Sequence, residues 1–111
     1  MEIKSSEQFC IFTPMSKKLS ATESQKLLSD VLKEKRFVGI DLSYVYDCTI
    51  DFIEEISKAA GFKQIGIFNI PSDIFAVFNI MQLDKTLNLY VSETDFEENT
   101  RRLLNRNFAV V

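Results

Sequence analysis

The amino-acid sequence predicts a single α/β domain with a mostly parallel central sheet of about four to five strands and about four helices. Its length of 111 residues suits one domain and is too short for two. Apolar residues alternate between strand-like runs and helical spacing, a pattern typical of parallel strands joined by right-handed crossover helices. Residues 37–42 are almost continuously apolar, as in a central strand covered on both faces. We therefore treat residues 1–111 as one domain.

The first half of the chain contains two expected strands and one expected helix. Residues 9–13 are β-branched or aromatic, and Pro14, which supplies no backbone donor, ends this strand. A helix is expected over residues 21–35, because Ser20 and Glu23 have the spacing of a capping box. Its apolar face comprises Leu27, Leu28, Val31 and Leu32. The central strand at residues 37–42 follows, and then a polar loop at residues 43–49.

The third quarter of the chain is predicted to form a short helix and another strand. The helix begins after residue 49 and ends at Gly61, a suitable C-cap residue. Its apolar stripe comprises Phe52, Ile53, Ile56 and Ala60. Glu54, Glu55 and Lys58 are expected on its solvent side. Residues 64–70 form the next strand.

The last part of the chain is predicted to form two helices separated by a strand. Ser72 is expected to be the N-cap of the first helix. The apolar residues of that helix are Ile74, Phe75, Val77, Phe78 and Met81. Residues 87–91 alternate as a strand, and residues 92–95 open a final helix. The apolar residues of the final helix are Phe96, Leu103 and Leu104.

Composition and charge narrow the range of partners and compartments. With 46% hydrophobic residues the chain can bury a core without metal or disulfide, and its net charge of −3 makes nucleic acid an unlikely partner. Cys10 and Cys48 lie among apolar or strand-forming residues and are expected to be reduced, buried thiols. No apolar run approaches the ~20 residues that span a bilayer. The first residues also lack the basic block and the apolar block of a signal peptide. We expect a cytoplasmic protein without membrane insertion.

The residue types that are missing exclude much of enzyme chemistry. The sequence has no histidine, which excludes a Ser-His-Asp triad, a Cys-His dyad and histidine-containing zinc sites. Gly61 and Gly66 have P-loop spacing, but Ile67 and Phe68 stand where the Lys and the Ser or Thr are required. We therefore predict no catalytic residue, no metal and no cofactor.

Polar residues gather after the central strand, at the edge of a sheet where ligands usually bind. They are Asp41, Asp47, Thr49 and Asp51. A Mg²⁺ site is conceivable there. The favoured interpretation is structural: Asp47 and Thr49 cap the following helix and Asp51 interacts with its N-terminal dipole.

One segment resembles a known family. The run Val38-Gly-Ile-Asp-Leu-Ser-Tyr-Val45, followed by an acidic turn and a helix, resembles the STAS domain shared by sulfate transporters and anti-sigma factor antagonists. Residues 69–72 resemble its strand-to-helix corner, and residues 83–92 resemble its closing turn and last strand. The resemblance covers about residues 6 to 105, which form the expected core of the domain. It implies a protein that binds partners through the loop and helix after the central strand.

The resemblance also identifies a motif that is broken here. Antagonists carry Asp-Ser-Ser-Gly in this loop, and an anti-sigma kinase phosphorylates the first serine. If Asp47 matches the aspartate, Cys48 takes the place of the phosphorylated serine and Thr49 that of the second. An alternative alignment introduces no gap after the central strand, and it places Ile50 and Asp51 at the positions of the two serines. Neither alignment supplies the serine of the switch, and Thr49 is the residue at which a displaced phosphorylation could occur.

The resemblance therefore implies a non-enzymatic protein-interaction module of the anti-sigma factor antagonist type. We expect its contact surface on residues 44–49 and on the exposed face of the helix at residues 50–60. Tyr44 and Tyr46 are the expected anchors, because tyrosine combines a large apolar face with a polar tip. The other expected partner-binding residues are Asp47, Cys48, Thr49, Asp51 and Glu54. The expected partner is an anti-sigma factor, a kinase-like protein or a transport-complex subunit.

Two alternatives stay open at this point. Some STAS proteins are accessory subunits of membrane transport complexes, and some bind small ligands. An enzymatic alternative is a Mg²⁺-dependent phosphoryl site at Asp41, Asp47 and Asp51, like that of response-regulator receivers. This alternative ranks last, because a receiver requires an acidic pair after its first strand, where this chain has Thr13 and Pro14.

Overall fold

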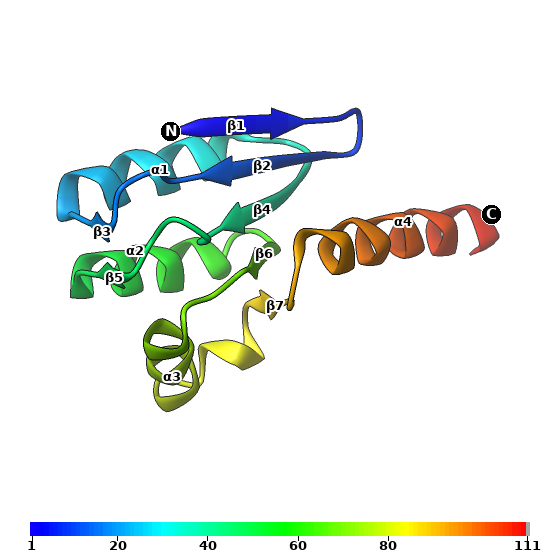
Figure 1. Ribbon diagram of the computed structural model, residues 1–111. Helices are drawn as coiled ribbons and strands as arrows, with labels where there is room; N and C mark the ends of the chain where they lie inside the picture. Colours follow the sequence, from blue (N-terminus) through cyan, green and yellow to red (C-terminus); the bar gives the residue numbers. More distant parts are fainter. Residues whose placement is uncertain (111) are drawn as a thin grey trace.

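The domain is built on one five-stranded sheet. The computed structural model describes the backbone of residues 1–110 and the side chains of residues 1–102. The strand order is β1-β2-β4-β6-β7, and every neighbouring pair is parallel except β1 with β2 (Figure 1). The strands are β1 (Glu2–Ser5), β2 (Phe9–Thr13), β4 (Phe37–Asp41), β6 (Ile65–Phe68) and β7 (Asn88–Leu89). The predicted fold class, a mostly parallel α/β sheet, is confirmed.

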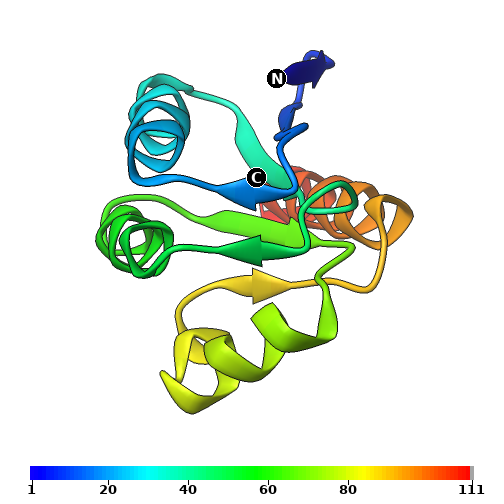
Figure 2. The ribbon, with the colours of Figure 1, turned by 60° about the vertical axis from the view of Figure 1, so that its left-hand side comes forward.

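The helices cover the two faces of this sheet unequally. Helices α1 (Ala21–Lys33) and α2 (Ile50–Ala60) pack on one face, and α4 (Glu93–Val110) lies on the other (Figure 2). Helix α3 (Ser72–Ile80) and the 3₁₀ turn η1 (Leu83–Lys85) complete the first layer next to β7. Three crossover helices on one face leave the other face to α4 alone.

Strand pleating sorts the side chains into two clusters, because successive residues of a strand point to opposite faces. The larger cluster, under α1, α2 and α3, takes from the strands Cys10, Phe12, Val38, Ile40, Ile65 and Ile67. The smaller cluster, under α4, comprises Phe9, Ile11, Phe68 and Phe96. Burial on both faces explains the almost continuous apolar runs of the central strands.

The first predicted helix begins where expected and ends earlier. The Ser20 hydroxyl accepts a hydrogen bond from the Glu23 amide at 3.2 Å, so the predicted N-cap is confirmed. The helix ends at Lys33 because Glu34 adopts extended backbone angles and its carboxylate binds Arg36. The expectation that Leu32 lies on the buried face is wrong, since its side chain is 47% exposed.

Helices α2 and α3 differ from the prediction in which residues they bury. In α2, Ala59 is buried and Ala60 only partly so, and Gly61 is the C-cap in a right-handed conformation. Pro71, not Ser72, is the N-cap of α3, because its ring already sets the φ of the position before the helix.

Helix α3 buries a narrower stripe than its sequence predicts. It buries Ile74 and Phe78, whereas Phe75, Val77 and Met81 are exposed. The reason is its position at the end of the sheet, where β7 offers only two residues to cover. In α4, Phe96 is buried as predicted, and Leu103 and Leu104 lie outside the described side chains.

Three short strands were not predicted. Strand β1 has four exposed residues and therefore no burial pattern to detect. Strands β3 (Lys18–Leu19) and β5 (Asp47–Cys48) pair in parallel as a second, two-stranded sheet. They are too short to show a period, and β5 lies inside the segment that was predicted to be a loop. The strands β6 and β7 are also shorter than the predicted ranges 64–70 and 87–91.

Candidate functional site

The candidate site is the segment that joins β4 to α2, at the edge where the parallel strands end. Its first anchor is Asp41, the last residue of β4. The Asp41 carboxylate accepts hydrogen bonds from the Ser43 amide at 2.9 Å and from the Asn69 side-chain amide at 3.1 Å. Asn69 follows β6 with φ of 54°, a left-handed conformation that asparagine tolerates better than most residues. Asp41 therefore ties the start of the segment to the end of the neighbouring strand.

Its second anchor is the short sheet formed by β3 and β5 (Figure 1). The amides of Tyr46 and Asp47 both donate to the Lys17 carbonyl, at 2.7 and 3.1 Å, and the Thr49 amide donates to the Leu19 carbonyl at 3.1 Å. Leu19 is itself buried, as are Leu42 and Val45 within the segment. The segment is thus held by backbone hydrogen bonds and buried side chains on both sides, and it presents a defined surface.

The exposed side chains of this segment are unusually apolar. Tyr44 is 49% exposed, Tyr46 69% and Ile50, the first residue of α2, 60%. Asp47 and Glu54 are exposed and supply negative charge beside them. We call Tyr44, Tyr46, Asp47, Ile50 and Glu54 the loop surface.

Sequence reasoning identified four of these five residues and missed Ile50. The signal for Ile50 was present, since it falls outside the helical stripe of Phe52, Ile53 and Ile56 and must therefore face away from the core. Lys18 was also missed: its ammonium lies 3.9 Å from the Asp47 carboxylate, both side chains being exposed. An exposed pair of this kind contributes little stability.

Thr49 occupies the N-cap position of α2 but does not cap it through its side chain. Its backbone is extended, with φ −79° and ψ 163°, as an N-cap requires. Its hydroxyl oxygen is buried and has no hydrogen-bond partner among the described residues. A kinase would reach this hydroxyl only after the segment opened.

Asp47 does not cap α2, contrary to the favoured interpretation. Its carboxylate accepts a hydrogen bond from the Cys48 amide at 2.9 Å, which lies outside the helix. Asp51, by contrast, lies in the first turn of α2, where the helix dipole favours a negative charge.

Cys48 takes the position of the switch serine in one alignment. It is partly buried against the larger cluster, whereas Cys10 is fully buried, and both are free thiols. Burial, with a smaller effect of the Asp47 carboxylate, raises the pKa of the Cys48 thiol to about 11. The thiol is therefore protonated at neutral pH and is a poor nucleophile.

Asp41, Asp47 and Asp51 are not gathered into a metal-binding cluster. Within the described part of the chain, no group of three or more His, Cys, Asp or Glu side chains is placed to hold a metal ion. Asp41 is bonded to Ser43 and Asn69, and Asp47 to Cys48. The receiver-like Mg²⁺ arrangement is thus not formed.

Nor does any helix in residues 1–110 combine the length and the apolar character needed to cross a bilayer.

Comparison with known proteins identifies the fold. No protein-family model matches this sequence, and no curated protein matches it significantly. The crystal structure of a candidate anti-sigma factor antagonist from Thermotoga maritima is similar to this one, with a TM-score of 0.74 and 16% sequence identity. The match covers 90% of this chain and 93% of that chain. The chain therefore has the α/β fold described for an anti-sigma factor antagonist, which is the fold that its STAS resemblance predicts.

Proposed function

We propose that this protein is a non-enzymatic interaction module of the anti-sigma factor antagonist type, which binds a regulatory protein through the loop surface. The observation that carries the proposal is the exposure of Tyr44, Tyr46 and Ile50 on a segment that is anchored at both ends. Its two free cysteines suit a reducing compartment, and we expect it to act in the cytoplasm.

The physical argument concerns the cost of binding. Ordering a mobile loop at an interface costs free energy, and a segment already held in place avoids most of that cost. Here the amides of residues 46, 47 and 49 are bonded to the carbonyls of Lys17 and Leu19 before any partner arrives. Two tyrosines and an isoleucine on such a frame have the character of interface anchors, whereas Asp47 and Glu54 favour a partner with basic groups around an apolar centre.

The same geometry argues against a serine-type phosphorylation switch. Cys48 has no hydroxyl, and the Thr49 hydroxyl is buried. A phosphate would bring close to two negative charges onto this surface and so release a partner. Without such a phosphate, binding of the partner is constitutive. We therefore propose that the partner is controlled by its own amount or by another modification.

Affinity purification from the native cell, followed by mass spectrometry, tests the proposal. Tyr46→Ala and Glu54→Lys should each reduce recovery of the partner that the wild-type protein retains, with an unchanged melting temperature. Phe62→Ala is the matched control, because Phe62 is an exposed aromatic residue, more exposed than Tyr46, that lies beyond the end of α2. Equal recovery by Tyr46→Ala and Phe62→Ala would remove the loop surface from consideration.

A second function, binding of a small ligand, is favoured by one specific observation. An open groove of about 610 Å³ adjoins the site and is lined by Asn69, Ile70, Phe75, Tyr90 and Val91 among others. Asn69 connects it directly to Asp41. Ligands of open α/β sheets often bind outside the carboxyl ends of the strands, where this groove lies. A native purification that retains a small molecule, or a transporter ATPase or permease, would favour this alternative.

A further inference from the structure

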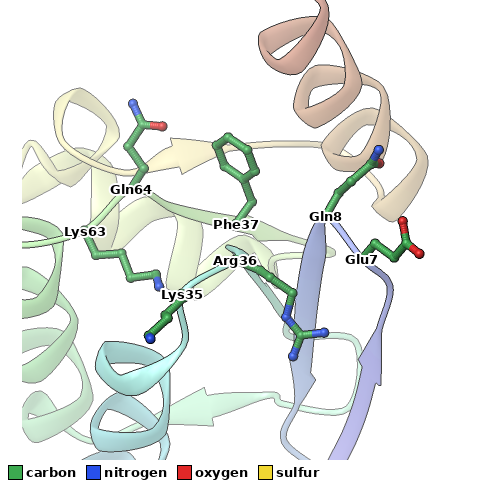
Figure 3. Close-up of a pocket in the computed structure, with 7 residues that line it drawn as sticks. All are labelled: Glu7, Gln8, Lys35, Arg36, Phe37, Lys63 and Gln64. Carbon is green, nitrogen blue, oxygen red and sulfur yellow. The ribbon is translucent and has the colours of Figure 1, made fainter. Parts of the chain in front are cut away.

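A second candidate site lies at the opposite edge of the sheet, where the parallel strands begin. Gln8, Arg36 and Gln64 directly precede β2, β4 and β6. With Lys35 and Lys63 they line an open pocket of about 470 Å³ over the ring of Phe37 (Figure 3). The pocket collects three cationic side chains in a protein whose net charge is −3. It shares no residue with the loop surface.

Arg36 has a structural role in this pocket. Its Nε and Nη2 donate to the two carboxylate oxygens of Glu34 at 2.7 and 3.0 Å, and its Nη1 donates to the Ser6 carbonyl at 2.8 Å. This arrangement fixes the turn between α1 and β4, from which Lys35 projects. It also occupies both oxygens of the Glu34 carboxylate, the nearest acidic group to these lysines on the turn.

Lys35 and Lys63 form no ion pair with any described side chain. Within residues 1–102 neither ammonium group makes a salt bridge or a hydrogen bond to the protein. Figure 3 shows both side chains on one side of the pocket, with Glu7 and Gln8 on the other. Lys63 is partly buried, and this burial lowers the pKa of its ammonium group. The nearby Glu34 carboxylate offsets this loss of water only in part, so a further anion beside the ammonium group is favoured.

We propose that this pocket binds a small ligand carrying a phosphate group, held between the ammonium groups of Lys35 and Lys63. A phosphate dianion matches two neighbouring ammonium groups, and lysine binds phosphate well as a point charge. The exposed edge of Phe37 supplies apolar surface for the organic part of the ligand. Glu7 on the far wall and the acidic remainder of the protein disfavour a long polyanion such as nucleic acid.

Inorganic phosphate is the probe that tests this site. In a ¹H–¹⁵N NMR titration of the full chain, the amides of residues 8, 35, 63 and 64 should shift and reach saturation. Sodium chloride at matched ionic strength should not reproduce the shifts. Lys63→Gln and Lys35→Gln should each weaken binding about fivefold or more, because each removes one of two charge-assisted contacts. Lys26→Gln, which removes an exposed lysine elsewhere on α1, should leave the affinity unchanged.

A second measurement uses the wild-type protein alone and is independent of folding of the variants. Saturation with phosphate should raise the pKa of Lys63, followed through its ¹³Cε shift, since a bound anion stabilises the charged form. The proposal is overturned if chloride produces the same shifts, if the three glutamine variants bind equally, or if phosphate leaves the titration of Lys63 unchanged.

Discussion

Gly39 on β4 and Gly66 on β6 are register partners across the sheet, and both lie beneath the ring of Phe96 from α4. A Cβ atom at Gly39 would come within 2.9 Å of the ring, and one at Gly66 within 2.7 Å. The ring also stacks on Phe68 at 5.6 Å between centroids and meets the rings of Phe9 and Tyr90 edge-on at 5.9 Å. The two glycines thus let α4 approach the sheet closely enough to close the smaller cluster.

Substituting Gly66 by alanine should destabilise the protein, because the added methyl group overlaps the Phe96 ring. We expect a loss of about 1–3 kcal/mol in the free energy of unfolding, the usual cost of overpacking a core. Urea denaturation measures it. Gly61→Ala is the control, since its Cβ would meet only the Lys58 carbonyl at 3.3 Å in a right-handed backbone. Equal stability of the Gly61 and Gly66 variants would contradict the packing described here.

Replacing Thr49 by valine should raise stability. The Thr49 hydroxyl is buried without a partner, and valine has the same shape without the polar group. An unsatisfied buried donor or acceptor costs about 1–3 kcal/mol, and we expect about 1 kcal/mol to be recovered. In thermal and urea unfolding, Thr49→Val should be more stable than both the wild type and Thr49→Ser, which keeps the hydroxyl. A less stable valine variant would show that the hydroxyl has a partner after all.

The Glu34–Arg36 pair should make stability depend on acid pH. The hydrogen bonds from the Arg36 side chain and amide lower the pKa of the Glu34 carboxyl from 4.5 to about 2. Because this pKa is lower in the folded state, the stabilisation is complete above about pH 4.5 and is lost as the pH falls through about 2. Glu34→Gln should therefore be less stable than the wild type at pH 7, and the difference should shrink between those values. The urea midpoints of the two proteins across this pH range measure their difference in stability. A difference that does not change with pH would contradict the prediction.

Cys48 should react slowly with alkylating reagents. With a thiol pKa near 11 rather than 9, the thiolate fraction at pH 8 is about a hundredfold smaller, and only the thiolate is nucleophilic. Iodoacetamide labelling, followed by peptide mass spectrometry, should show at least this retardation relative to the urea-denatured protein. The rate should rise with pH up to about 11. Rapid labelling at pH 7 would mean that the segment opens frequently.

The anchored segment should be visible in hydrogen exchange. The amides of Tyr46 and Asp47 donate to the Lys17 carbonyl, just before β3, and the Thr49 amide donates to the Leu19 carbonyl within β3. These amides should exchange more slowly than the amide of Tyr44, which makes no backbone hydrogen bond within the described part of the chain. Leu19→Ala should accelerate them, because loss of a buried leucine side chain costs about 2–5 kcal/mol and frees β3. Leu32→Ala, an exposed site, is the control. Unprotected Thr49 exchange in the wild type would show that the loop surface is mobile.

Particular elements show why some of the fold could be predicted and some could not. The bounds of Phe9–Thr13 and Ile50–Ala60 were predicted correctly. The strand is a run of β-branched and aromatic residues that Pro14 ends, and the helix has an apolar stripe of helical period between a capping position and Gly61. The pairing of β3 with β5 escaped prediction because each strand has two residues and they are nearly 30 positions apart. For the same reason, the exposure of Tyr44 and Tyr46 was expected, but the backbone hydrogen bonds of Tyr46 to Lys17 and of Thr49 to Leu19 were not.

The sequence by itself determined the four helices, the four parallel strands β2, β4, β6 and β7 in their order along the chain, and the chemical character of the segment after β4. These properties depend on local periodicity, capping residues and the types of side chain present. Only the tertiary structure decided that Thr49 is buried, that Ile50 is exposed, that α3 leaves Phe75 outside and that Lys35 and Lys63 share a pocket. Each of these depends on contacts between residues far apart in the chain, which local patterns do not encode.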